Sequence, residues 1–231
     1  MLKLEVLGTV QDGGVPHLGY TSEINEEARQ DITEARFVDS LLIKDNDRDD
    51  SVRYLINATP DIRFQIAGEY IDGVFISDSI FGSLPGLLHF GEAALDASDV
   101  EVMCSTDTEE YLQKNDPYRY LLDRENIHTN VVHSHDEIDV LGGTIQPVKV
   151  ERCGGETFAF EIRGDERTVF YARDFESLTD HIKGHIEEAD VAIICGTFWD
   201  REEVKRFEEI PHAPISETMP ELEDLDTQVY Y

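Results

Sequence analysis

The sequence has 231 residues, with 50 acidic and 19 basic side chains and a formal net charge of −31. A chain of this length can bury a substantial core, and its hydrophobic content of 40% is ordinary for a globular protein. A surface this acidic repels phosphate, which argues against nucleic acid and anionic membranes as partners.

The acidic residues are spread over the whole chain, and lysine is scarce relative to arginine. This pattern is typical of a high-salt cytoplasm, where salt shortens the reach of charge repulsion. We prefer that interpretation to a specific cation-binding role. Three widely spaced cysteines, Cys104, Cys153 and Cys195, suggest no disulfide framework. Without a signal peptide, twin-arginine segment or bilayer-spanning apolar run, the sequence predicts a soluble cytoplasmic protein.

The first predicted elements surround a glycine-rich loop. An apolar strand over residues 2–7 breaks at Gly8, and the loop continues to residue 17. It is not a phosphate-binding P-loop, because no Gly-Lys-Ser/Thr follows. An acidic segment over 23–36 is helix-prone or irregular, and a strand over 37–44 ends in a charged turn over 45–51.

The segment over residues 54–90 is the part around which the chain is organised. Its apolar run at 54–56 predicts a buried strand. Thr59, with a proline directly after it, predicts an N-cap and a helix over 61–69. A second apolar run over 73–77 leads into a polar turn over 77–83. In such α/β units, loops at the carboxyl ends of strands usually carry the chemistry.

Strands and helices alternate through the rest of the chain. Strands are predicted over 100–104, 141–145, 158–162 and 168–172, and helices over 106–114 and 177–189. Thr106 and Glu109 predict a capping box. The wholly apolar run at 191–195 predicts a central strand buried on both faces. No repeat or low-complexity linker divides the chain, so we expect a single α/β domain over residues 1–231.

Several motifs are similar to a known family. Residues 57–63, Asn-Ala-Thr-Pro-Asp-Ile-Arg, resemble the metallo-β-lactamase superfamily, in the branch that contains the pyrroloquinoline-quinone (PQQ) biosynthesis protein B. Tyr-Ala-Arg-Asp at 171–174, Gly-Thr-Phe-Trp at 196–199 and His-Ala-Pro-Ile-Ser at 212–216 extend the resemblance over nearly the whole chain. It implies a four-layer αβ/βα sandwich. The family's last strand begins much like residues 228–231, where this sequence stops, so that strand and its ligand are expected to be missing.

The resemblance also implies a metal site, and this sequence replaces most of its ligands. In the family, the strand around residue 75 ends in Thr-His-x-His-x-Asp-His. The corresponding residues here are Ser77, Asp78, Ile80, Gly82 and Ser83. Four of these residues stand where the family has its metal ligands, and Asp78 is the only one of the four that could bind a metal. The family's third metal motif is a histidine shortly before residue 158, and the segment 148–152 contains none.

The candidate site consists of Asp78, Asp174 and His212. The resemblance implies that Asp174 takes the place of an aspartate that bridges two metals, and that His212 faces the substrate side. Asp174 could instead be a polar cap after a strand, and His212 a packed loop histidine. Asp78 and Asp174 are weak metal candidates, because two carboxylates do not make a tight zinc site. Two other histidine pairs, at 133/135 and 181/185, are assigned to an exposed loop and a solvated helix.

We therefore predict a metallo-β-lactamase-fold protein that has largely lost its metal site. It would need no cofactor and would bind a small-molecule ligand or a protein partner without catalysis. The alternative is a metal-dependent hydrolase or oxygenase with a reduced site. There, Asp78, Asp174 and an unrecognised histidine would hold one zinc or other divalent metal and lower the pKa of its bound water.

Overall fold

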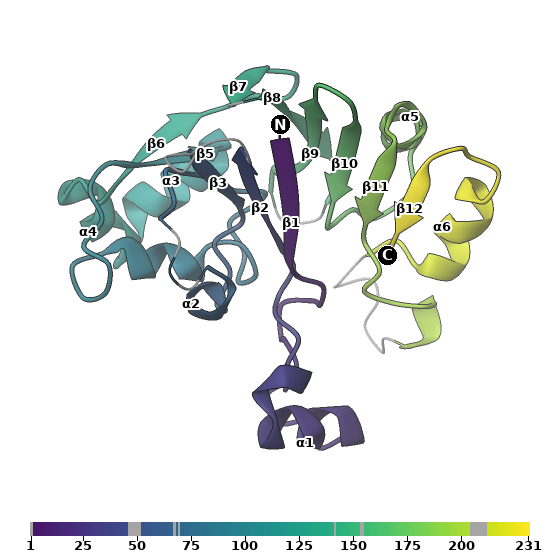
Figure 1. Cartoon of the computed structure of the whole chain (residues 1–231), viewed down its shortest axis with the longest axis horizontal. Coiled ribbons are helices and arrows are strands. Elements are labelled where there is room, and N and C mark those ends of the chain that lie inside the picture. The colour runs from purple at the N-terminus through teal and green to yellow at the C-terminus, as the bar shows by residue number, and fades with distance from the viewer. Residues whose placement is uncertain are drawn as a thin grey trace. The chain divides into compact units, whose positions relative to one another are not determined.

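The structure is a computed structural model that describes residues 2–45, 52–66, 68, 70–140, 142–152, 155–203 and 212–231. The chain divides into two compact units (Figure 1). The N-terminal unit is Lys3–Val131, and the C-terminal unit is Met1–Leu2 with Val132–Tyr231. Each unit is built on one six-stranded sheet with helices, so the chain belongs to the α/β class, as predicted.

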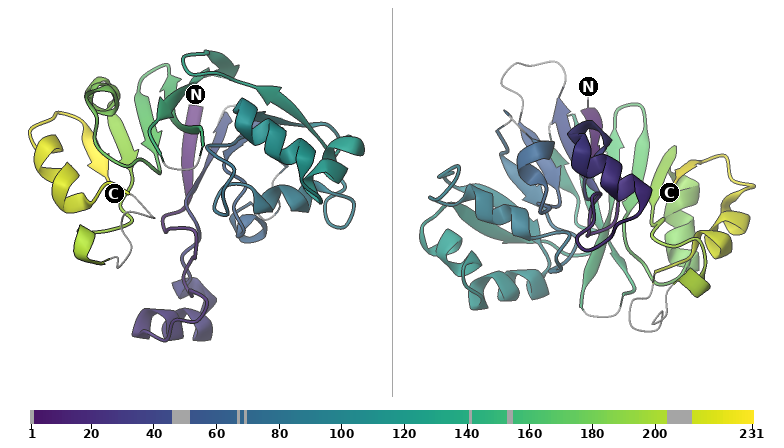
Figure 2. Two further views of the ribbon diagram at one scale, coloured as in Figure 1. Left: turned by 180° about the vertical axis from the view of Figure 1, so that it is seen from behind. Right: turned by 90° about the horizontal axis from the view of Figure 1, so that it is seen from below.

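The N-terminal unit has the strand order β1-β2-β3-β4-β5-β6. Its strands are β1 (Leu2–Gly8), β2 (Ser40–Asp45), β3 (Arg53–Ile56), β4 (Gly73–Phe75), β5 (Val100–Cys104) and β6 (Ile127–Val131). Its helices are α1 (Glu23–Gln30), α2 (Ile62–Gln65), α3 (Thr106–Lys114), α4 (Tyr118–Asp123) and the 3₁₀ helices η1 (Ile32–Glu34) and η2 (Pro85–Phe90). Strands β3 to β6 run parallel, whereas β2 and β3 are antiparallel. Helix α1 lies away from this sheet, at the end of an extended segment (Figure 2).

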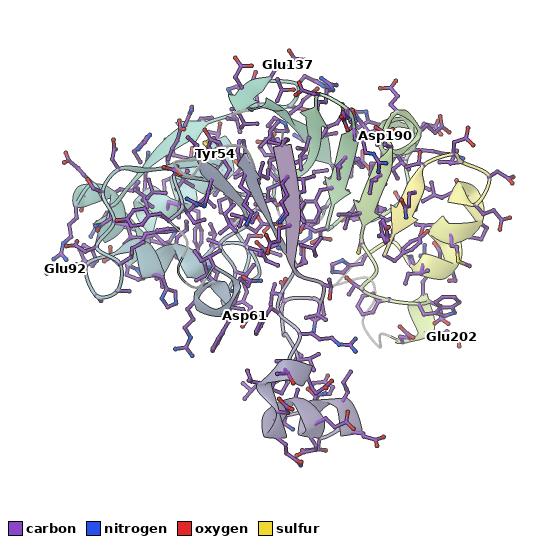
Figure 3. The ribbon with its side chains drawn as sticks, viewed as in Figure 1. Tyr54, Asp61, Glu92, Glu137, Asp190 and Glu202 are labelled. Atoms are coloured by element: carbon purple, nitrogen blue, oxygen red, sulfur yellow. The ribbon has the colours of Figure 1, made fainter. Side chains whose placement is uncertain are left out.

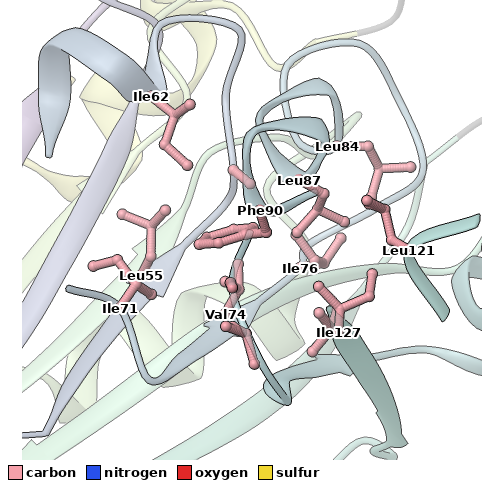
Figure 4. Packing of buried hydrophobic residues seen from close by; sticks show 14 of the residues in the cluster. Leu55, Ile62, Ile71, Val74, Ile76, Leu84, Leu87, Phe90, Leu121 and Ile127 are labelled. Carbon is pink, nitrogen blue, oxygen red and sulfur yellow. The ribbon is translucent and has the colours of Figure 1, made fainter. Parts of the chain in front are cut away.

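The core of this unit forms where β3 and β4 meet η2. Leu55, Val74, Ile76, Leu87 and Phe90 are all buried and belong to one hydrophobic cluster (Figure 4). A close backbone approach fixes the loop that follows β3. The amide of Gly86 donates to the carbonyl of Ala58, and a Cβ on Gly86 would lie 2.5 Å from the carbonyl oxygen of Thr59. Only glycine allows this contact without displacing backbone.

Helix α2 is shorter than predicted, and the side chains before it do not make the predicted cap. The hydroxyl of Thr59 accepts from the amide of Asp61 and donates to Gln65, which makes a turn instead of a helix cap. The carboxylate of Asp61 accepts from the amide of Val38, 2.9 Å away, and makes no cap bond. The helix runs from Ile62 to Gln65, whereas the prediction was 61–69; residues 67 and 69 lie outside the described part of the chain.

The predicted cap of α3 was wrong by one residue. Ser105 is the N-cap, with extended backbone, and its hydroxyl accepts from the amide of Thr108. Thr106 is already helical. The carboxylate of Glu109, which was to complete a capping box, accepts instead from the hydroxyl of Thr129 on β6 at 2.6 Å.

The C-terminal unit has the strand order β12-β11-β10-β9-β8-β7. Its strands are β7 (Ile138–Val140), β8 (Gly143–Val150), β9 (Thr157–Gly164), β10 (Thr168–Ala172), β11 (Val191–Ile194) and β12 (Gln228–Tyr230). Its helices are α5 (Asp180–Glu188), α6 (Ile215–Leu222) and the 3₁₀ helix η3 (Arg201–Glu203). Phe170, Ile182, Ile186, Ala192 and Leu222 join sheet and helices in one buried cluster. In both units, the described helices are too short or too polar to cross a membrane.

Strand β11 differs from its prediction in burial. Ala192 and Ile194 are buried, whereas Val191 and Ile193 are half-buried, so the strand does not bury both faces. Strand β7 was not predicted, and β8 is longer than the predicted strand over 141–145. The final residues form β12, which pairs in parallel with β11. The charged turn predicted over 45–51 lies almost wholly outside the described residues.

Candidate functional site

The direction of the strands gathers four chain segments at one edge of the C-terminal sheet. Strands β8 and β10 are both antiparallel to β9, and β10, β11 and β12 are parallel. The carboxyl ends of these four strands therefore lie at the same edge. Arg152 follows β8, Asp174 follows β10, and Cys195 and Thr197 follow β11. Polar side chains distant in sequence thus come from neighbouring strand ends, where sites in α/β proteins usually lie.

Asp174 is the centre of this cluster. It is 2% exposed, and its Oδ2 lies 2.6 Å from Nε of Arg152. Its Oδ1 lies 3.0 Å from Nδ1 of His212, at ion-pair distance, but no well-aligned hydrogen-bond donor reaches it from the part of the chain that the structure describes. One buried carboxylate therefore faces two basic side chains, which compensate the cost of burying its charge.

His212 is held on several sides. Its Nδ1 lies 3.4 Å from the sulfur of Cys195 and 3.5 Å from the hydroxyl of Thr197, and its ring meets Phe198 edge-on. Burial by itself would lower the pKa of His212, but the contacts with Asp174 and Cys195 raise that pKa to about 10. His212 is therefore a cation at neutral pH. Only 14% of the His212 side chain is exposed, so it is packed as well as charged, and its role in a site stays a prediction.

Asp78 lies in the N-terminal unit, in the loop after β4. It is 3% exposed, and its Oδ1 accepts from the hydroxyl of Ser83 at 2.7 Å and from the amide of Ile80 at 3.2 Å. Its Oδ2 is buried and has no hydrogen-bond partner among the described residues. The preceding Ser77 exchanges two hydrogen bonds with Asn57, which ties this loop to the end of β3. The polar turn predicted here is therefore a closed, internally bonded loop.

The structure thus brings Asp174 and His212 together. Asp78 belongs to the other unit, and its convergence with these two residues stays a prediction. Sequence reasoning did not select Arg152 or Cys195 as site residues. Each lies directly after a strand that runs in the same direction as β10. Their position after these strands would have indicated a shared site once the strand directions were known.

Three other histidines, His135, His181 and His185, form a separate cluster in the C-terminal unit. His135 is in an exposed loop, as predicted. His185 is not simply solvated: its Nδ1 lies 2.6 Å from the buried Glu161, and its ring stacks on Phe170. His181 lies between His135 and His185, at ring-centroid distances of 6.2 and 4.9 Å. Burial, and the charges that His185 and His135 would carry, lower the pKa of His181.

The residues around Asp174 do not fit a transition-metal site of the family type. A zinc site needs about four nitrogen, sulfur or oxygen donors that point at one position. Arg152 and His212 instead place positive charge on the carboxylate that would hold the ion. In the described part of the chain, no group of three or more His, Cys, Asp or Glu side chains could hold a metal ion.

The N-terminal unit also contains a groove, which is separate from the candidate site residues. It has a volume of about 500 Å³ and apolar walls that include Leu88, Tyr120 and Leu121. None of the candidate site residues lines it. The chemistry of the cluster around Asp174, and not the size of this groove, therefore defines the candidate site.

Comparison with known proteins places the chain in a family. Residues 52–231 match the beta-lactamase superfamily domain, so the chain belongs to the beta-lactamase superfamily. No curated protein sequence matches it significantly.

Solved structures show the same fold. Zn²⁺-bound PqqB from Methylobacterium extorquens has a TM-score of 0.81 at 18% identity, covering 99% of this chain and 86% of its own. A diphosphatase from the PhnP family has a TM-score of 0.75 at 20% identity, covering 98% and 84%. The short form of human tRNase Z has a TM-score of 0.63 at 12% identity, covering 100% and 96%. The predicted metallo-β-lactamase-like fold class is confirmed. At these identities, the likeness extends to the fold alone.

Proposed function

We propose that this chain is a non-catalytic member of the metallo-β-lactamase-fold proteins, similar to the PQQ biosynthesis protein B, whose metal site has been largely lost. Its role would be to bind a small-molecule ligand or a protein partner. The observation that carries this proposal is the contact of Asp174 with Arg152 and His212. The family resemblance assigns a metal-bridging role to Asp174, and here its charge is balanced by side chains of the chain itself.

The energetic argument concerns competition for one carboxylate. A divalent ion at Asp174 would have to displace the guanidinium of Arg152, which is only 17% exposed. Removing one partner of a buried ion pair typically costs about 3 to 5 kcal/mol, because the other charge stays buried. A metal would have to overcome that cost with few other donors nearby. The internal ion pairs therefore favour a metal-free protein.

The test is to measure metal content and turnover on the same preparation. The full chain, purified in molar potassium chloride, should contain no stoichiometric zinc, iron or manganese by elemental analysis. It should also hydrolyse phosphodiester, β-lactam and thioester substrates no faster than the buffer alone. One tightly held zinc or iron per chain, lost in Asp174→Ala, would overturn the proposal in favour of the reduced-site hydrolase or oxygenase.

The environment and the excluded partners form a second part of the proposal. Acidic side chains project from both units, among them Glu92, Glu137, Asp190 and Glu202 (Figure 3). With the net charge of −31, they support a protein adapted to a high-salt cytoplasm. The same charge argues against an RNA partner, although tRNase Z structures share the fold.

A further inference from the structure

We propose that Arg152 and His212 form a binding site for a small oxyanion, a carboxylate or a phosphate, at the carboxyl edge of the C-terminal sheet. This inference rests on the proposed function, because it requires that no metal ion occupies Asp174. It adds the chemical class of the ligand, which the fold alone does not give.

The first step of the argument is the unused donors of Arg152. A guanidinium carries five N–H donors in a rigid planar fork. Asp174 contacts Nε, and the described part of the chain offers no ion pair or hydrogen bond to the two terminal nitrogens. The side chain is 17% exposed, and its terminal nitrogens are not among the buried side-chain atoms that lack a partner, so they are open to solvent. Asp174 thus holds the guanidinium in place while its outer edge keeps its donors for a ligand.

The second step is the second basic side chain on the same carboxylate, His212. The contacts of His212 with Asp174, Cys195 and Thr197 all involve Nδ1. The remaining ring nitrogen, Nε2, has no partner among the described residues. Asp174 therefore contacts two side chains that keep nitrogens without a partner in the described part of the chain, namely the terminal nitrogens of Arg152 and Nε2 of His212. The neighbouring Glu151 is exposed, where solvent screens its charge.

The third step is the choice of ligand class. Carboxylates and phosphates present two oxygens in the geometry that a guanidinium binds with two parallel hydrogen bonds. A cation would be repelled by the guanidinium of Arg152 and would meet N–H donors instead of acceptors, and an apolar ligand would leave the donors without partners. Because Asp174 already orients Arg152, little side-chain entropy is lost on binding. An oxyanion therefore satisfies the cluster better than the other two classes do.

The experiment is isothermal titration calorimetry of the full chain in molar potassium chloride, with inorganic phosphate and, separately, acetate. We expect saturable binding of one ion per chain for at least one probe, and the probe that binds better distinguishes a phosphate from a carboxylate ligand. Arg152→Lys keeps a positive charge beside Asp174 but lacks the fork, so its affinity should be about tenfold weaker.

The matched control is Arg163→Lys. Arg163 also pairs with a buried carboxylate, that of Glu161, but it lies near the carboxyl end of β9, at the opposite edge of the sheet. This variant should bind the probes as the unmodified chain does. If Arg152→Lys does not fold, the double variant Arg152→Gln, Asp174→Asn removes both charges together and should also lose binding.

Two outcomes would overturn the inference: no saturable binding of either probe by the folded chain, or equal affinities in the Arg152→Lys and Arg163→Lys variants. Either outcome in a metal-free, inactive protein leaves the proposed function intact. Stoichiometric metal, in contrast, overturns the proposed function itself.

Discussion

Replacing Asp174 by asparagine should destabilise the protein strongly, although asparagine has nearly the same shape. The carboxylate is 2% exposed and lies 2.6 Å from Nε of Arg152 and 3.0 Å from Nδ1 of His212. Without its charge, two basic side chains stay largely buried with no counter-ion. Removing one partner of a buried ion pair costs about 3 to 5 kcal/mol.

The pKa of His212 sets a second bound on how much the contact with Asp174 stabilises the folded protein. A rise in this pKa from 6.5 to about 10 corresponds to at most about 5 kcal/mol of preferential stabilisation of the cation. Cys195 contributes part of that rise, so the share of Asp174 is smaller. A group whose pKa is raised by folding stabilises the protein fully below its unfolded pKa. This contribution should therefore be lost as the pH rises from about 6.5 to about 10, and Asp174→Asn should flatten that dependence.

The assay is urea unfolding in molar potassium chloride, at neutral pH and at several alkaline pH values. Asp190→Asn is the control, because the Asp190 carboxylate is exposed and accepts from the amide of Thr168. The control should lose no more than about 1 kcal/mol of the free energy of unfolding. If Asp174→Asn loses as little as the control, Asp174 is not the counter-ion that we describe.

Three further predictions concern salt, packing and the candidate site. The thermal midpoint should rise from dilute buffer to molar potassium chloride, because the screening length falls from about 10 Å at 0.1 M to about 3 Å at 1 M; an unchanged midpoint would contradict this. Gly86→Ala should lose about 1 to 3 kcal/mol of unfolding free energy, since its Cβ would lie 2.5 Å from a carbonyl oxygen. Gly184→Ala, on α5 with open space around it, should instead gain up to about 1 kcal/mol, and equal effects would refute the packing argument. Finally, an experimental structure should place the three candidate site residues in one cleft, and any of them on the far face would remove the site.

The sequence by itself determined the features that depend on local pattern. Apolar runs located β3, β5 and β10 almost to the residue, because a strand that is largely buried carries apolar side chains at most of its positions. The motifs at 57–63 and 196–199 led to the correct superfamily, since backbone turns and close contacts restrict which residues fit. Composition gave the net charge directly.

Tertiary structure decided which polar groups meet. Thr59 and Glu109 have side chains suited to helix caps, but Gln65 and Thr129 bind them instead. Arg152 and Asp174 are separated by two strand reversals, and only the directions of β8, β9 and β10 bring them to one sheet edge. A hydrogen-bonding group takes whichever partner the fold places nearest in the correct direction. Local sequence specifies the group, whereas the partner depends on strand order and direction, which long-range packing determines.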